Sequence, residues 1–90
     1  MNAADIPPQR YEDIILALLH ARAEGATLCP SEAARAVARD TDTDWRTLMA
    51  ATREAACRLA AAGRIVVTQR GVPVDPLQAR GPIRLRLNGA

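Results

Sequence analysis

The sequence predicts an α+β fold, mainly α, in which three helices precede a β-hairpin. Helical spacing of apolar residues recurs in three segments before Gly63, and two strand-like runs, "RIVVTQ" and "PIRLRL", follow it. Ninety residues provide for only one core, because a chain of this length buries roughly 60 to 65% of its unfolded surface. We therefore expect a single domain over residues 10–88, preceded by a disordered lead over residues 1–9.

The first helix is expected from Tyr11 to Ala23. Gly25 is placed to end it as a cap. His20 falls off the apolar stripe and is expected to be exposed to solvent. The stripe itself recurs with about 3.6 residues per turn and consists of Tyr11, Ile14, Ile15, Leu18 and Leu19.

The second helix is expected over "PSEAARAVARD". Pro30 suits the first helical position, because its missing N–H would be unpaired there. Glu32 stands at the third position of a capping box, although Cys29 is a poor substitute for the usual Ser or Thr. The helix is expected to run to about Asp40, with Ala33, Ala34 and Val37 on its buried side and Arg35 and Arg39 outward.

The third helix is expected to begin with Asp42, Thr43 or Asp44 as its cap and to run through Ala62 to Gly63. Its core face is predicted to consist of Trp45, Leu48, Met49, Thr52, Ala56 and Leu59, and its exposed flank of Arg46, Ala50, Arg53 and Cys57. Two helices joined by about four residues are typical of a helix-turn-helix.

The two strand-like runs are expected to pair antiparallel. Ile65, Val67, Ile83, Leu85 and Leu87 would then face the helices, and Arg64, Val66, Thr68, Arg84 and Arg86 would form the opposite, basic face. The prolines in the connection argue against a continuous ladder there. Three helices followed by a hairpin with a long loop is the order of a winged helix-turn-helix, and the hairpin would be its wing.

The charge is divided unevenly along the chain. Residues 1–63 carry seven Arg against nine acids, a net −2, while residues 64–90 carry five Arg against one acid, a net +4. Such asymmetry marks a surface for nucleic acid or an acidic partner, or else a solvated strand face that protects a sheet edge from aggregation. Every basic residue except His20 is Arg. A G+C-rich genome favours Arg and Ala codons together, but Arg also binds phosphate bidentately.

Three sequence elements, "CPSEAARAVA", "DWRTLMAATREAACRLAAAGRIVVTQRGVPVD" and "RGPIRLRL", resemble a family of short bacterial proteins known only as a domain of unknown function. The resemblance covers roughly residues 11–87, implies a winged-helix-like fold and brings no catalytic residues.

The layout is also similar to small bacterial winged-helix regulators. Their DNA-contact positions would correspond to Arg46, Ala50 and Arg53 in the third helix and to Arg70 and Arg80 in the wing loop. One departure is the acidic cluster of Asp40, Asp42 and Asp44 at the start of the third helix, which suits the helix dipole but repels phosphate.

We expect the protein to bind nucleic acid, double-stranded DNA before RNA, as a transcriptional regulator. Phosphate contacts are expected from Arg64, Arg70, Arg80, Arg84 and Arg86, and base-edge contacts from Arg46 and Arg53. The alternative is a protein-interaction or assembly domain, as a homodimer or with another protein. A mixed-charge face around Asp44, Glu54 and Arg58 would serve that role.

Catalysis is not expected, because no nucleophile, base and orienting group form a recognisable set. Neither a cofactor nor a metal is expected, since Cys29 and Cys57 lie 28 positions apart and form no CxxC pair. No apolar run approaches the roughly 20 residues that span a bilayer, so we expect no membrane partner and a cytoplasmic location. Cys29 has two interpretations: a small residue near the core, or a redox-responsive thiol at a helix N-terminus.

Overall fold

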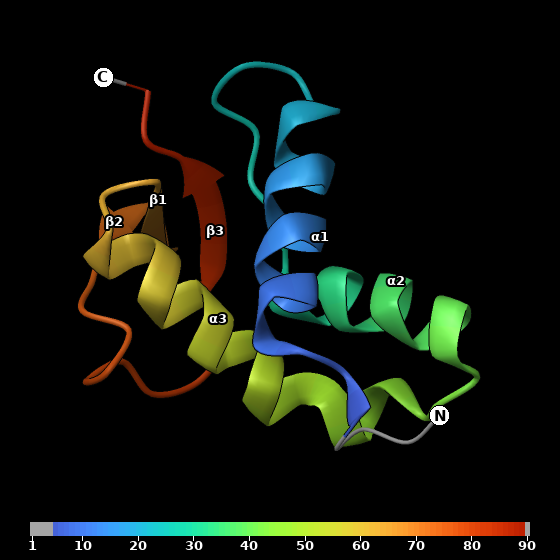
Figure 1. Cartoon of the computed structure of the whole chain (residues 1–90). Helices are drawn as coiled ribbons and strands as arrows, with labels where there is room; N and C mark the ends of the chain where they lie inside the picture. The colour runs from blue at the N-terminus through green and yellow to red at the C-terminus, as the bar shows by residue number, and fades with distance from the viewer. Residues whose placement is uncertain (1–4, 90) are drawn as a thin grey trace.

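Three helices followed by a three-stranded antiparallel sheet make up the computed structural model, which describes residues 5–89 (Figure 1). The elements are α1 (Pro8–His20), α2 (Pro30–Thr41), a 3-10 turn η2 (Trp45–Leu48), α3 (Met49–Ala61), β1 (Ile65–Gln69), β2 (Val72–Pro73) and β3 (Arg84–Leu87). Helix α1 lies between β3 and α2. The predicted fold class is confirmed, and the arrangement is compatible with a winged helix.

Helix α1 lies further toward the N-terminus than predicted. It begins at Pro8, where proline fits the first helical turn, and Ile6 is buried against the core. Residues 5–9 therefore belong to the fold, in contrast to the expected disordered lead, whose residues 1–4 lie outside the described part. The helix ends at His20 because residues 21–24 offer no large apolar side chain to bury, and Gly25 turns the chain with a φ of +80°.

The third helix starts in a tighter form than predicted. Of the three candidate caps, Asp44 caps it: its side chain accepts a hydrogen bond of 3.0 Å from the N–H of Arg46. Asp42 instead ends α2 in a left-handed conformation. The first turn is the 3-10 turn η2, and α3 continues from it. Leu48, Thr52, Ala56 and Leu59 are buried as predicted, together with Ala55, while Trp45 and Met49 are partly buried.

Strands β1 and β3 pair antiparallel as predicted, from Ile65 opposite Leu87 to Thr68 opposite Arg84. The side chains expected to face the helices do so: Ile65, Val67, Ile83 and Leu85 are buried and Leu87 partly so. Thr68 differs from the expected exposed face, because it is only 3% exposed. It lies in the central strand with neighbours on both sides, Pro73 and Arg84, which are longer or bulkier than its own short side chain.

Strand β2 was not predicted, because Pro73 argued against a ladder in this segment. Gln69 pairs with Val72 across a two-residue turn, so Thr68 and Pro73 form the next pair along. In an antiparallel ladder that next pair is the one that exchanges no hydrogen bonds, so the missing N–H of Pro73 costs nothing there. The N–H of Val74 then bonds to the carbonyl of Val67 at 2.9 Å.

A single residue between α1 and α2 joins the free edge of β3. The N–H of Leu28 donates to the carbonyl of Leu85 at 2.7 Å, and the N–H of Leu85 returns a bond of 2.8 Å. Both leucine side chains are fully buried. This bridge, which the sequence analysis missed, places the start of α2 directly beside β3.

Candidate nucleic-acid interface

Three arginines of the helical part are neutralised by acids on other elements. The pairs are Arg10 with Asp40, Arg22 with Glu32 at 2.7 Å, and Arg58 with Glu12 at 2.9 Å. Each pair joins residues that are at least ten positions apart in the sequence. Their guanidinium groups therefore serve the fold itself.

The arginines of the sheet and its loop form no such ion pairs in the described part of the chain, and neither do Arg35, Arg39 and Arg53 of the helices. Within residues 5–89, no acid or hydrogen-bond acceptor contacts the guanidinium groups of Arg64, Arg70, Arg80 and Arg86. The one acid in this part of the sequence is Asp75, and its carboxylate accepts a bond of 2.9 Å from the N–H of Leu77. The positive charges of these four arginines therefore have no acid partner in the described structure.

One face of the sheet collects three of the predicted phosphate contacts. Arg86 lies opposite Val66 and Arg84 opposite Thr68, so both arginines project to the same face, and Arg64 precedes Val66 by two positions in the strand direction. Arg64 and Arg84 are exposed and Arg86 is partly buried. The strand pairing therefore places Arg84 and Arg86 on the predicted basic face, whereas Thr68 on that face is buried and Arg64 lies just before β1.

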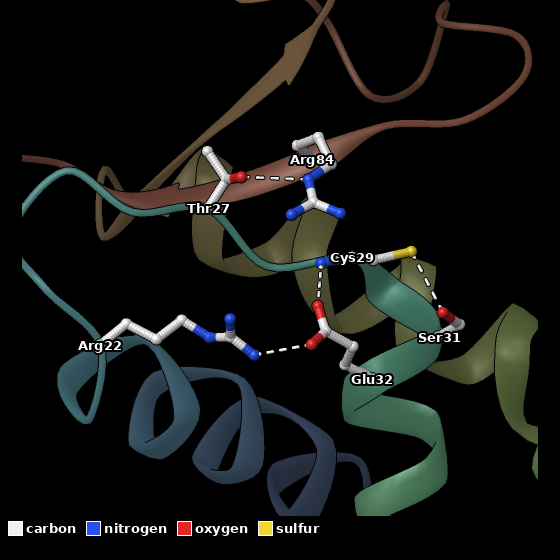
Figure 2. Close-up of polar contacts among 6 residues, drawn as sticks. All are labelled: Arg22, Thr27, Cys29, Ser31, Glu32 and Arg84. Atoms are coloured by element: carbon white, nitrogen blue, oxygen red, sulfur yellow. Dashed lines mark hydrogen bonds and ion pairs between the residues drawn. The ribbon is translucent and has the colours of Figure 1, made fainter.

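Arg84 is held more firmly than the other sheet arginines. Its Nε donates to Oγ1 of Thr27 at 3.0 Å, in the segment before α2 (Figure 2). The nearby carboxylate of Glu32 accepts a bond of 2.8 Å from the N–H of Cys29. That backbone bond lowers the pKa of Glu32 most, with help from the hydrogen bond and charge of Arg22 and the charge of Arg84. Arg84 is thus partly engaged by the fold.

The loop between β2 and β3 is folded back on the hairpin. The side-chain amide of Gln69 donates to the carbonyl of Pro82 at 3.2 Å and also to the carbonyl of Arg80. A hollow results that is lined by Gln69, Arg70, Val74, Arg80, Pro82 and Arg84. Three of these lining residues are arginines and none is an acid.

The two predicted base-contact residues lie apart from the sheet and its loop. Arg46 belongs to η2, at the opposite end of α3 from β1, and is exposed; Arg53 is partly buried on α3. Arg46 lies 3.6 Å from the carboxylate of Asp44 and 4.7 Å from the ring centre of Trp45. The seven predicted site residues therefore form two groups, one on the helix and one on the sheet.

Arg35 of α2 contacts Trp45, outside the set of site residues that the sequence predicted. Its guanidinium lies 4.5 Å from the ring centre of Trp45, so the tryptophan contacts two arginines. Arg35 and Arg39 also line a groove together with Leu18 and Trp45. The outward direction of Arg35 was visible in the helical spacing, but its contact with a residue expected in the core was not.

The mixed-charge face expected around Asp44, Glu54 and Arg58 is altered by the pairing of Arg58. Besides its bond to Glu12, the Arg58 guanidinium donates to the carbonyl of Pro8 at 3.3 Å. It is therefore directed toward α1. Glu54 remains exposed on α3.

Both cysteines are free thiols and partly buried. The sulfur of Cys29 lies 3.1 Å from the hydroxyl oxygen of Ser31 (Figure 2). Over residues 5–89, no group of three His, Cys, Asp or Glu side chains could hold a metal ion. None of the helices in the described part is long and apolar enough to cross a membrane.

The protein family described as "Protein of unknown function (DUF3253)" matches residues 8–88. The chain belongs to this family. The match spans all three helices and all three strands, and it confirms the resemblance inferred from the sequence elements. No curated protein matches the chain. The DUF3253 description names no activity, so a functional proposal must rest on the geometry.

Proposed function

We propose that this member of the DUF3253 family binds nucleic acid, double-stranded DNA before RNA, and acts as a transcriptional regulator. The observation that carries the proposal is the cluster of arginines without an acid partner on the sheet and its loop. Arg10, Arg22 and Arg58 are neutralised by acids, whereas Arg64, Arg70, Arg80 and Arg86 have no such partner within residues 5–89. Free guanidinium groups on one face and loop suit an extended phosphate backbone.

The sheet and its loop supply the affinity in this proposal. Arg64, Arg70, Arg80, Arg84 and Arg86 contact phosphates, and about five neutralised phosphates give log affinity a slope of about −4.5 against log salt concentration. Arg84 contributes least, because Thr27 already accepts its Nε–H and Glu32 lies nearby.

The turn η2 and helix α3 orient the protein on the nucleic acid in this proposal. Arg46 of η2 and Arg53 of α3 contact base edges, while the nearby carboxylates of Asp44, which caps η2, and Glu54 of α3 repel the phosphate backbone of the nucleic acid. Base discrimination by α3 is therefore modest in this proposal, and most of the binding free energy is independent of sequence.

The test is fluorescence anisotropy of a labelled random DNA duplex, titrated with protein at several salt concentrations, with an RNA duplex in parallel. The informative variant is Arg64→Gln/Arg86→Gln, because neither side chain has a partner in the described structure. A matched variant, Arg35→Gln/Arg39→Gln, removes the same charge from the exposed side of α2. We expect steep salt dependence and a much larger loss in the sheet variant. Salt-independent binding, equal losses in both variants, or no binding at low salt would contradict the proposal.

Self-association is the second candidate, supported by two exposed apolar side chains. Leu77 is 77% exposed and Val72 is 61% exposed. Leu77 also lines a groove at the end of α3 with Cys57, Ala61 and Val66. A homodimer would bury this groove, and light scattering after size-exclusion chromatography tests it. A mass that stays monomeric at the highest concentration, both in the native protein and in Leu77→Ser, would exclude it.

A further inference from the structure

The turn between β1 and β2 holds an arginine in a backbone conformation that arginine rarely adopts. Gln69 pairs with Val72, so Arg70 and Gly71 are the two central residues, with φ of +53° and +80°. Two-residue hairpins of this kind favour Asn-Gly or Asp-Gly, because the first central residue needs a left-handed backbone. The backbone gives no reason for arginine at this position. An outlier of this kind points to a use for the side chain.

The turn forms a narrow, exposed tip. Arg70, Gly71, Val72 and Pro73 are all exposed, and the Arg70 guanidinium contacts no acid within residues 5–89. A single cation flanked by uncharged residues therefore stands at the end of a two-stranded ribbon.

The tip is also fixed in place before any ligand binds. Strand β2 pairs with β1 up to the turn, and the Gln69 side chain bonds to the carbonyls of Arg80 and Pro82 in the returning loop. Arg80 therefore has its backbone anchored beside the hairpin, while Arg70 projects from it. The ribbon therefore loses little conformational entropy when it binds a ligand.

From these observations we infer that Arg70 enters the minor groove of double-stranded DNA and makes the protein prefer A·T-rich sites. This inference rests on the proposed function. The minor groove is about 6 Å wide, and A·T tracts narrow it further and concentrate negative potential there, which attracts an inserted arginine. Val72 and Pro73 lie against the sugars that form the groove walls. Arg80 and Arg84, which line the hollow beside Arg70, contact the phosphates at its rim.

The experiment uses three duplexes of one length whose central segment is A·T, G·C or inosine·C. Inosine·C has the major-groove edge of G·C but lacks the amino group in the minor groove, so it resembles A·T there. Anisotropy of the full chain at fixed salt should give equal affinity for A·T and inosine·C, with G·C about 5- to 10-fold weaker. An inosine·C affinity equal to that of G·C would place the contact in the major groove and overturn the inference.

Two variants assign the preference to Arg70. Arg70→Asn suits the turn better than the native residue, so its melting temperature should not fall, while the preference among the three duplexes should disappear. Arg80→Asn removes the same charge from the loop between β2 and β3, and it should weaken binding to all three duplexes equally and leave the preference intact.

The outcomes separate this inference from the proposed function. A preference that survives in Arg70→Asn overturns the inference and leaves DNA binding standing. Uniform affinity of the native protein for all three duplexes does the same. Failure of the native protein to bind any duplex overturns both.

Discussion

The Nε atom of Arg58 donates to Oε2 of Glu12 at 2.9 Å and thereby ties the last turn of α3 to α1. The Arg58 side chain is 41% exposed and that of Glu12 is 20% exposed, so solvent screens the pair. We expect Arg58→Ala to lower the free energy of unfolding by about 1 kcal/mol, of which the coupling to Glu12 is about 0.5 kcal/mol. Urea unfolding of Arg58→Ala, of Glu12→Ala and of the double variant measures this coupling.

The same variant provides a control for the proposed function. Because Arg58 is already neutralised by Glu12, Arg58→Ala should leave DNA affinity nearly unchanged. A loss as large as that of Arg64→Gln/Arg86→Gln would mean that net charge alone governs binding.

Glu32 should make stability depend on pH in a defined direction. The N–H of Cys29, followed by Arg22 and Arg84, holds the pKa of Glu32 below its ordinary value of 4.5. A carboxyl whose pKa is lowered in the folded state stabilises the fold at pH values above its ordinary pKa. This contribution is lost as the pH falls through the lowered pKa. The stability gap between the native protein and Glu32→Gln should therefore be full at neutral pH and shrink as the pH falls below 4.5. A gap that stays constant across this range would refute the assignment.

Tyr11 carries a buried hydroxyl that has no hydrogen-bond partner within the described residues. Its side chain is 3% exposed, and burial raises the pKa of the phenol because the charged form is disfavoured. Removing the hydroxyl should therefore not cost stability. We expect Tyr11→Phe to unfold at equal or higher urea concentration, with a gain of up to about 1 kcal/mol. A clear loss of stability would show that the hydroxyl has a partner.

Asp44 combines two opposed roles: it caps η2, and its charge lies at the end of the helix proposed to face DNA. Serine caps nearly as well, so Asp44→Ser should stay within about 0.5 kcal/mol of the native stability. It also removes the acid beside Arg46, which should raise DNA affinity about threefold at low salt. Asp44→Ala separates the two roles, since it should lose about 1 kcal/mol of stability but show the same gain in affinity.

The spacing of apolar residues predicted the parts of the fold in which buried side chains recur at helical or strand intervals. Leu48, Thr52 and Leu59 share one side of a helix wheel, and the alternation through Ile83 to Leu87 assigned the strand faces correctly. Leu28 escaped prediction because a single buried residue in a short connection between helices has no period to detect. The start of α1 was missed because Ile6 is isolated by two prolines from the helical stripe.

The candidate site was only partly predictable for a related reason. The surplus of arginine after residue 63 is a property of the sequence, but whether each arginine is free depends on partners far away in the chain. Arg10 and Asp40 are 30 positions apart, and Arg84 and Thr27 are 57 apart. The strained turn at Arg70 also required coordinates, because Pro73 concealed the two-residue hairpin.

The bridge between Leu28 and Leu85 constrains the order in which the protein can mature during synthesis. The helices leave the ribosome first, but Leu28 has no partner until β3 has been translated, 57 residues later. Until then, the core around Leu28 lacks the side chain of Leu85, which is fully buried in the finished fold. A nascent chain stalled before residue 83 should therefore remain sensitive to protease, and protection should appear only once Arg84–Leu87 have cleared the exit tunnel.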